Sequence, residues 1–499
     1  MTKRLAWFAL LVLAAIPYVR SVGSPLLYDD RTLLNNRWLV REAGPVSVFE
    51  HDYWYGTKHA ESDLYRPLSI LSLAWNLRAT PSKEGIRAVN IASHALAVLA
   101  LFWMLDAIGA GTVPEGRGQS PFPRRAAWIG AAVFAVHPLG SEAVLWAVGR
   151  AEILAAIFGM VAFVLFTKVS AEDGYGGWRL ALSAVSFFTA LCFKESASTW
   201  LVIGAAWLLL APARRGGPTR LVVARVSPYL AVFGAYVLLR ASAVGWGRHA
   251  PPFLDNPLAH VNGATRAANA VLLFARYAGK MLVPNTLSVE YGFDQLPTVA
   301  LFPWGAAAAL VITACVAGAI FILHRRGQSE AAFCAAFVPC AFAVTGNLAF
   351  PIGTVFAERL AYTPLLGACG LAGLALATIP KSSWRALAVG AVVVALGART
   401  VSRGDDYRSL AALTEATTEA SPHAVKALVN AGRNRLRQGN AAGARPLLES
   451  AVAIWPDYAG AWRLLADVYA ALGDATRAAD AKARADAASS RDQDAADPL

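Results

Sequence analysis

Charged residues are scarce in this chain. Only 16% of its 499 residues are Asp, Glu, Lys or Arg, whereas 56% are hydrophobic, and the mean hydropathy is +0.45. The surface of a soluble protein of this size has to be covered with polar groups. The composition therefore argues against a soluble globular protein and predicts a polytopic membrane protein.

Cysteines are also few, and none lies in a polar segment. A disulfide framework needs cysteines in segments exposed to an oxidising compartment, and a Cys-type zinc site needs closely spaced pairs. The sequence indicates neither of these. The five cysteines all fall within apolar runs, at Cys192, Cys315, Cys334, Cys340 and Cys369.

Basic residues outnumber acidic residues, which gives a formal net charge of +12. Such an excess is common in nucleic-acid-binding proteins. Here, however, the arginines and lysines form short clusters between apolar runs, as the positive-inside rule describes. We therefore attribute the basic charge to membrane topology and expect no nucleic-acid partner.

About eleven apolar runs approach the length of about 20 residues that a membrane-spanning helix needs. The first run follows Thr2-Lys3-Arg4 and has no obvious small-residue cleavage site, so we expect a retained signal anchor. The runs lie near residues 5–22, 86–108, 126–147, 150–168, 179–193, 196–211, 226–245, 299–323, 331–350, 360–379 and 384–398.

The charges between the runs predict their orientation. If the amino terminus is cytoplasmic, every inside connection is basic. The outside connections then hold the acidic residues and the unusual motifs, and an active site built from loops is expected at that outer face. The outside motifs are Asp29-Asp30, His137 with Glu142, Arg150 with Glu152, Lys194-Glu195, Asp255-Asn256-Pro257, Glu290-Tyr291 and Glu358-Arg359.

Two of the outside connections are long, at residues 21–85 and 246–298. The first is rich in Trp and Tyr, which suit the membrane interface because they combine an apolar body with a polar tip. We expect interfacial helices near residues 32–41 and 68–77. In the second connection we expect a juxtamembrane helix at residues 269–282.

After residue 398 the composition becomes rich in Ala, Arg, Asp and Glu, and a pattern repeats at a spacing of about 34 residues. Small residues such as Gly432 and Ala444 stand where two helices would cross, and Pro456 follows the second helix. This is the tetratricopeptide pattern. We expect a repeat domain at residues 399–488, with a preceding helix near 405–420, and a disordered tail at residues 489–499.

The ordered set of motifs resembles the transmembrane and tetratricopeptide-repeat-containing O-mannosyltransferases and their prokaryotic relatives. The likeness covers nearly the whole chain. It implies a GT-C fold for residues 1–398, an all-α membrane bundle followed by the short repeat domain, and a polyprenyl-phosphate sugar as donor. The motifs are Tyr28-Asp29-Asp30, Tyr65-Arg66-Pro67-Leu68, Val89-Asn90 with His94, Ala135-Val136-His137-Pro138 to Glu152, Lys194-Glu195-Ser196, Asp255-Asn256-Pro257 and Glu358-Arg359 to Pro364.

Sugar transfer to a hydroxyl needs a base that takes the acceptor proton. The resemblance places Asp29 and Asp30 at the catalytic acidic motif of the first outer loop, where one carboxylate tunes the other. The alternative is that the pair caps a helix starting near Thr32, because aspartate accepts hydrogen bonds from the free amides of a helix start.

The departing phosphate needs cations. Arg359 is our first candidate because a guanidinium binds phosphate oxygens with two hydrogen bonds. Further candidates for phosphate binding are Lys194, Arg66 and Arg150, and the expected supporting residues are Glu358, Glu195, Glu152 and His137. The alternative is that these neighbouring charges form ion pairs that fix helix ends.

Two histidines and the acidic residues raise the question of a metal site. A histidine before proline, such as His137, more often bonds locally than acts as an acid or ligand, and His94 lies on an apolar face. No close-spaced ligand cluster demands a metal, so we predict metal-independent transfer without a cofactor. A divalent ion held by Asp29, Asp30 and Glu358 is the alternative.

The sequence thus predicts an inverting glycosyltransferase that moves a sugar such as mannose from a polyprenyl phosphate to a hydroxyl, for example of protein Ser or Thr. We expect it in a bacterial inner membrane, with the site and repeats periplasmic, or in the endoplasmic reticulum membrane of a eukaryote. The repeats would bind a protein acceptor or partner, or pack over the site as a lid. A non-enzymatic scaffold is the main rival, and a transporter is the weakest, because the polar groups gather at one end of the spans.

Overall fold

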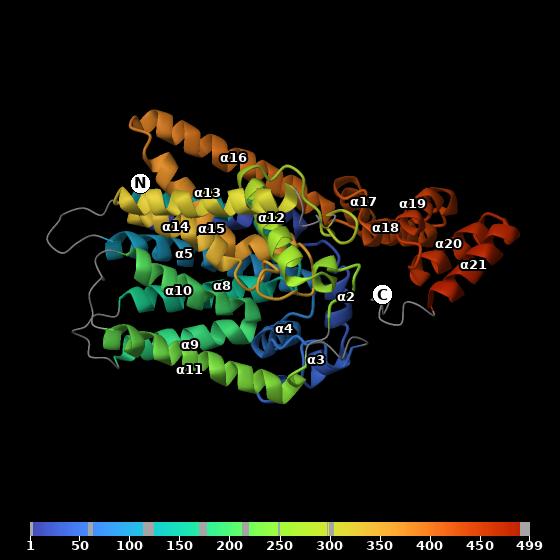
Figure 1. The fold of residues 1–499 in the computed structure, drawn as a ribbon, viewed down its shortest axis with the longest axis horizontal. Coiled ribbons are helices and arrows are strands. Elements are labelled where there is room, and N and C mark those ends of the chain that lie inside the picture. The colour runs from blue at the N-terminus through green and yellow to red at the C-terminus, as the bar shows by residue number, and fades with distance from the viewer. Residues whose placement is uncertain are drawn as a thin grey trace.

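The computed structural model describes residues 3–57, 63–112, 124–168, 177–211, 219–247, 250–296, 298 and 304–489. Within these ranges the chain is helical and has no strand, so the predicted all-α membrane bundle followed by a repeat domain is confirmed. Figure 1 shows the long helices of the bundle side by side. The short helices α2, α3 and α4 lie at the same end as the repeat helices, and the N-terminus lies at the other end.

Seven helices of the described ranges are long and apolar enough to cross a membrane. An eighth candidate is a pair of helices bent by 56°. The seven are α1 (Lys3–Ala15) with η1 (Ile16–Ser21), α5 (Lys83–Thr112), α8 (Arg150–Thr167), α11 (Thr219–Val244), α13 (Ala306–Arg325), η8 (Glu358–Ala361) with α15 (Tyr362–Ala377), and α16 (Ser382–Asp406). The bent pair is α6 (Arg124–Ala135), followed by η3 (Pro138–Gly140) and α7 (Ser141–Leu145).

Three predicted spans are shorter than a bilayer requires. They form α9 (Trp178–Phe193), α10 (Thr199–Leu210) with η4 (Glu195–Ser198), and α14 (Ser329–Ala341). At 1.5 Å per residue, a helix of 13 or 16 residues does not cover a hydrocarbon core of about 30 Å. Each of the eleven runs thus contains a helix within the described residues, but the helix of the run at 331–350 ends at Ala341, and fewer than eleven meet the length of a full span.

Two sequence features shape the bundle near the site. Pro138 disfavours helical geometry at His137, whose backbone is extended (φ −76°, ψ 126°), and this ends α6 and bends the pair. Glycines allow α6 and α15 to pack closely: a Cβ at Gly130 would lie 2.8 Å from the Cys369 carbonyl oxygen. The middle parts of α6 and α15 are thereby held close together.

The first long loop contains α2 (Asp29–Leu34), α3 (Arg37–Arg41), η2 (Ser47–Phe49) and α4 (Pro67–Ala79). The helix expected at residues 32–41 is split into α2 and α3, because the Asn36 side chain accepts a hydrogen bond from the Trp38 amide and starts a new helix. The helix expected at residues 68–77 is α4.

The second long loop contains η6 (Pro257–His260) and α12 (Gly263–Leu282). The expected juxtamembrane helix at residues 269–282 is part of α12, which begins earlier. The side chain of Asn262 sets this start by accepting a hydrogen bond from the Thr265 amide at 2.9 Å.

The repeat domain consists of α17 (Leu410–Ala420), α18 (Val425–Arg437), α19 (Ala441–Ile454), α20 (Ala459–Ala471) and α21 (Ala475–Ser489). The close crossing expected at Gly432 is present, since a Cβ there would meet Leu448 at 2.7 Å. Because α16 is continuous to Asp406, residue 399 falls inside a helix and the repeat helices begin at Leu410. Residues 490–499 of the predicted tail lie outside the described residues.

Candidate functional site

A cavity of about 490 Å³ lies at the end of the bundle that faces the repeat domain, between the loops of the bundle and the first repeat helices. Several separate parts of the chain form its walls. The lining residues include Tyr28, Asp29 and Trp54 from the first loop, Asp255 and Glu290 from the second, Phe356 and Arg359 before α15, and Thr414, Thr417, Lys426, Asn430 and Arg433 from α17 and α18. The predicted convergence of distant segments at one end is therefore present.

The structure separates the two aspartates of the opening motif. Asp29 lines the cavity, whereas Asp30 points into the protein and is 2% exposed. The Asp30 carboxylate accepts hydrogen bonds from the backbone amides of Ala147 at 2.8 Å and Val148 at 3.0 Å. Asp30 therefore fixes the turn between α7 and α8, and Asp29 is the aspartate that faces the cavity.

The capping alternative for this pair does not hold in its original form. Helix α2 begins at Asp29 itself rather than near Thr32, and its N-cap residue is Tyr28. Tyr28 has a φ of 45°, a conformation that L-residues rarely adopt and that often marks a constrained functional position.

Burial raises the pKa of Asp30 to about 6, although the two amide hydrogen bonds and the charge of Arg87 act in the opposite direction. Two effects therefore oppose each other at Asp30. The hydrogen-bond donors stabilise the charged carboxylate, whereas burial away from water destabilises it.

Arg359 lies on the cavity wall and is fixed there by Glu142. Its guanidinium donates to one carboxylate oxygen of Glu142 at 2.6 Å, and its backbone amide donates to the other at 2.8 Å. The Glu142 side chain is fully buried, whereas that of Arg359 is 28% exposed. A guanidinium has five N–H donors in a planar fork, so this pairing orients Arg359 and leaves donors to face the cavity.

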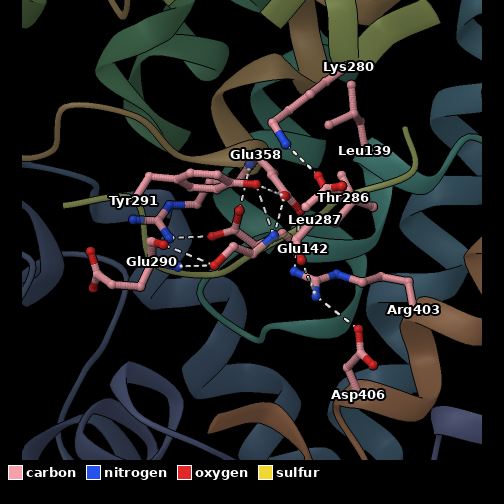
Figure 2. Close-up of polar contacts among 12 residues, drawn as sticks. Leu139, Glu142, Lys280, Thr286, Leu287, Glu290, Tyr291, Glu358, Arg403 and Asp406 are labelled. Carbon is pink, nitrogen blue, oxygen red and sulfur yellow. Dashed lines mark hydrogen bonds and ion pairs between the residues drawn. The ribbon is translucent and has the colours of Figure 1, made fainter. Parts of the chain in front are cut away.

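Glu358 turns away from its neighbour Arg359 and joins a different network, which Figure 2 shows. Its carboxylate accepts hydrogen bonds from the Tyr291 hydroxyl at 2.5 Å and the Ser288 amide at 2.6 Å. It also pairs with Arg403 of α16 at 3.3 Å, and Arg403 in turn pairs with Asp406 at 2.9 Å. This network ties the site to the helix that leads into the repeats.

Lys194 and Glu195 also pair with distant partners rather than with each other. The Lys194 ammonium contacts Glu152, with both side chains almost fully buried. Arg66 donates two hydrogen bonds to Glu195, at 2.8 and 2.5 Å. Burial lowers the pKa of Lys194 although Glu152 opposes this shift. Neither Lys194 nor Arg66 is among the residues that line the cavity.

Arg150 is 1% exposed and lies away from the cavity lining. Its guanidinium donates to the side chains of Asn90 at 2.7 Å and Asn76 at 2.6 Å, and to the backbone carbonyls of Ser72 and Ile86, both at 3.1 Å. The geometry gives Arg150 a structural part, linking α4, α5 and α8.

Both histidines are bonded within the protein, His137 in part locally and both of them also to residues far away in the sequence. His137 is buried, its Nε2 lies 3.0 Å from the Met281 carbonyl, and its Nδ1 accepts from the Leu139 amide at 3.3 Å. His94 lies between the Tyr362 hydroxyl and the Ala135 carbonyl. These contacts stabilise the bent helix pair.

Several cavity residues have no counterpart among the predicted site residues. They are Asp255, Glu290, Lys426, Asn430 and Arg433. Burial raises the pKa of Glu290, and the nearby charges of Lys426 and Asp255 act on it with opposite signs. Topology places Asp255 and Glu290 among the outside motifs without giving them a role, and nothing in the sequence places α18 against them.

No group of three or more potential metal ligands is present among the described residues. The carboxylates of Asp30 and Glu358, named as alternative ligands, are both held by protein donors. Metal independence stays a prediction, because no observation here tests it.

An apolar groove of about 310 Å³ lies next to the cavity, between α12, α13 and α14. Residues 346–348 and 355 line the groove, and residues 353, 354, 356 and 357 line the polar cavity. The ring of Tyr277 faces the groove and stacks on Phe356 with a centroid distance of 3.8 Å. One loop thus divides an apolar compartment from a polar one.

Comparisons with known proteins agree with the motifs. A tetratricopeptide-repeat family profile matches residues 435–497. Protein O-mannosyl-transferase TMTC4 of Homo sapiens is 24% identical over 482 residues, covering 87% of this chain and 64% of the relative. Protein O-mannosyl-transferase TMTC3 of Mus musculus is 25% identical, covering 89% and 50%, and TMTC1 of Homo sapiens is 25% identical, covering 89% and 54%.

The chain spans between about half and two thirds of the length of these relatives. The similarity covers both the bundle and the repeats. The resemblance that the ordered motifs indicate is therefore confirmed: over most of its length, the chain is similar to the transmembrane and tetratricopeptide-repeat-containing protein O-mannosyltransferases.

Proposed function

We propose that this chain is a membrane glycosyltransferase that moves a sugar, such as mannose, from a polyprenyl phosphate to the hydroxyl of a protein Ser or Thr. The observation that carries this proposal is that Asp29 and Arg359, 330 positions apart, line one cavity at the end of the bundle that faces the repeat domain. A carboxylate and a guanidinium in one cavity are the base and the phosphate ligand that such a transfer needs.

The proposed reaction is a single displacement with inversion. Asp29 takes the proton of the acceptor hydroxyl while its oxygen forms a bond to C1 of the sugar. The bond between C1 and the phosphate oxygen breaks, and the polyprenyl phosphate leaves with the electron pair. Asp30 positions Asp29 by anchoring the start of α2 to the amides of Ala147 and Val148.

Arg359 would stabilise the negative charge that grows on the phosphate as the bond breaks. Charge-assisted hydrogen bonds from a guanidinium are strong and directional. They contribute most when the donor is already oriented, so that little reorganisation accompanies the reaction. The two hydrogen bonds to Glu142 supply this orientation.

The apolar groove supports the lipid-linked class of donor. It lies between helices of the bundle, and its lining is almost entirely apolar. A polyprenyl chain in this groove would place its phosphate near residues 353–357, on the side where Arg359 lies. A water-soluble nucleotide sugar has no lipid chain that could fill this apolar groove.

The test uses the full chain in proteoliposomes with a polyprenyl-phosphate mannose and a peptide rich in Ser and Thr. We expect wild-type protein to release polyprenyl phosphate and mannosylate the peptide, and Asp29→Asn to abolish both. Asp480→Asn is the matched control, because Asp480 is an exposed aspartate of α21 that pairs only on the surface with Arg484. Full transfer by an inserted and folded Asp29→Asn protein would refute the assignment.

A further inference from the structure

The cavity has one wall that belongs to the repeat domain. Lys426, Ala427, Asn430 and Arg433 of α18 all line it. Residues spaced by three or four positions share one face of a helix, so a continuous stripe of α18 faces the cavity. Thr414 and Thr417 of α17 extend this wall. The repeats therefore form part of the same compartment as Asp29 and Arg359.

This wall is held in place by the second outer loop. The ring of Phe253 stacks on Trp455 with a centroid distance of 4.9 Å, and Leu254 is buried in the hydrophobic cluster of the repeats. The Lys426 ammonium pairs with Asp255 at 2.5 Å, and the Val425 amide donates to the Phe293 carbonyl at 2.8 Å. The contacts combine apolar, ionic and backbone interactions, so α18 is docked at a defined position.

The cavity has the bundle on one side and α18 on the other, and these two sides offer different places for the donor and the acceptor. The apolar groove adjoins residues 346–357, so a lipid-linked donor enters from the bundle side, where Arg359 also lies. The repeats lie at the end of the molecule, beyond the bundle (Figure 1). The acceptor is the substrate without a lipid, and the α18 wall is the side that remains for it.

Asn430 is the side chain on this wall best suited to a polypeptide. It is half-buried and lines the cavity. A primary amide donates through its NH₂ group and accepts through its oxygen, and so it can bond to both polar groups of a peptide unit at once. Lys426 is already paired with Asp255, whereas no hydrogen bond joins the Asn430 amide to another described side chain.

We propose that the α18 face is the acceptor subsite of the transferase, with Asn430 binding the backbone of an extended peptide whose Ser or Thr hydroxyl points to Asp29. This inference rests on the proposed function, and it makes the repeat domain a part of the active site. It also explains why the second outer loop is bound so closely to the repeats: the docking fixes the distance from Asn430 to Asp29.

The experiment compares wild-type protein, Asn430→Ala and Gln438→Ala, each as the full chain in proteoliposomes. Gln438 is the matched control, because it is an exposed amide residue that directly follows α18 and does not line the cavity. Two quantities are measured: the KM for a Ser- and Thr-rich peptide during transfer, and the Kd for a polyprenyl phosphate by fluorescence.

We expect Asn430→Ala to raise the peptide KM about tenfold, with the Kd for polyprenyl phosphate within twofold of wild type, and Gln438→Ala to change neither. An unchanged peptide KM, or an equal loss of affinity for polyprenyl phosphate, would overturn the acceptor assignment. Peptide binding is also measured directly by anisotropy, which needs no turnover. Failure of wild-type transfer counts against the proposed function, whereas equal peptide binding by wild type and Asn430→Ala counts against the subsite alone.

Discussion

The guanidinium and the backbone amide of Arg359 donate to the two oxygens of one buried carboxylate, that of Glu142. Glu142 lies in α7, the second half of the bent pair. If α6 continued straight through Pro138, Glu142 would lie further along the axis of α6 and would not reach Arg359 at the start of α15. The bend thus has a direct effect on the site, because it delivers the group that orients the proposed phosphate ligand.

Glu142→Gln should weaken binding of polyprenyl phosphate by roughly 10- to 100-fold, because hydrogen bonds to charged groups contribute about 1.5–3 kcal/mol. The amide can accept from only one of the two Arg359 donors. The measurement is the Kd for polyprenyl phosphate in proteoliposomes. Glu449→Gln is the control, since Glu449 forms an exposed pair with Arg445. Equal affinity in both variants would mean that Arg359 needs no orientation by Glu142.

Asp29→Asn and Asp30→Asn should fail in different ways. Asp29→Asn should lower kcat by about 10²- to 10⁴-fold with little change in thermal unfolding, because it removes the proposed general base. Asp30→Asn should lower stability by about 1–3 kcal/mol, since it leaves a buried amide donor of Ala147 or Val148 unpaired, and should keep more of the activity. If Asp30→Asn abolished transfer at full stability while Asp29→Asn stayed active, the two roles would be exchanged.

The raised pKa of Asp30 predicts a dependence of stability on pH. Its folded pKa of about 6 exceeds the ordinary value of 3.8, so between these values the folded state binds more protons than the unfolded state. Stability from this group is therefore largest below about pH 4 and is lost as the pH rises through about 6, by about 3 kcal/mol. When the pH is raised from 4 to 7, the midpoint of thermal unfolding should fall more in wild type than in Asp30→Asn. Parallel pH curves would contradict the prediction.

Variants of the buried Lys194–Glu152 pair test whether Lys194 stabilises the fold or binds the donor phosphate. Lys194→Ala should destabilise the protein by about 3–5 kcal/mol, because it leaves Glu152 buried without its partner. The double variant Lys194→Met with Glu152→Leu should recover most of that loss. Thermal unfolding in detergent measures both effects. If the double variant were stable and yet lost affinity for polyprenyl phosphate, Lys194 would belong to the phosphate site after all.

Trp455→Ala should loosen the repeat domain from the bundle, because it removes the stacking on Phe253 and the edge contact with Phe293. Aromatic pairs contribute about 0.5–1.5 kcal/mol each beyond the burial of their surface. Limited proteolysis should then cut residues 407–424 faster, and transfer should fall. Leu472→Ala, at an exposed position of the repeats, is the control. Unchanged proteolysis with full activity would show that the docking is not needed.

Much of the fold follows from local properties of the sequence. The eleven apolar runs and the Gly432 crossing are visible in it because hydrophobicity and residue size act over a few positions. The same information does not separate a full span from a short one: α14 ends at Ala341, although the apolar run continues to residue 350. It also does not distinguish Asp29 from Asp30, because the amides that capture Asp30 belong to Ala147 and Val148, more than 100 positions away.

The pairing of charges is the part of the site that local reasoning misses most. Glu358 beside Arg359, and Lys194 beside Glu195, suggest pairs between neighbours. In the structure all four bond across helices instead, because adjacent side chains at a helix start point in different directions. The contribution of α18 depends on docking against residues 252–255, and no feature of either segment alone predicts that contact.

The cavity lies against the beginning of the repeat domain and not against its last helix. Helices α17 and α18 supply the repeat wall of the cavity, with Tyr458 at the start of α20, while α21 contributes no lining residue. A repeat stack grows by adding helix pairs, each touching only its neighbours. Repeats added beyond α21 would therefore extend the proposed acceptor surface and leave the lining of the cavity unaltered.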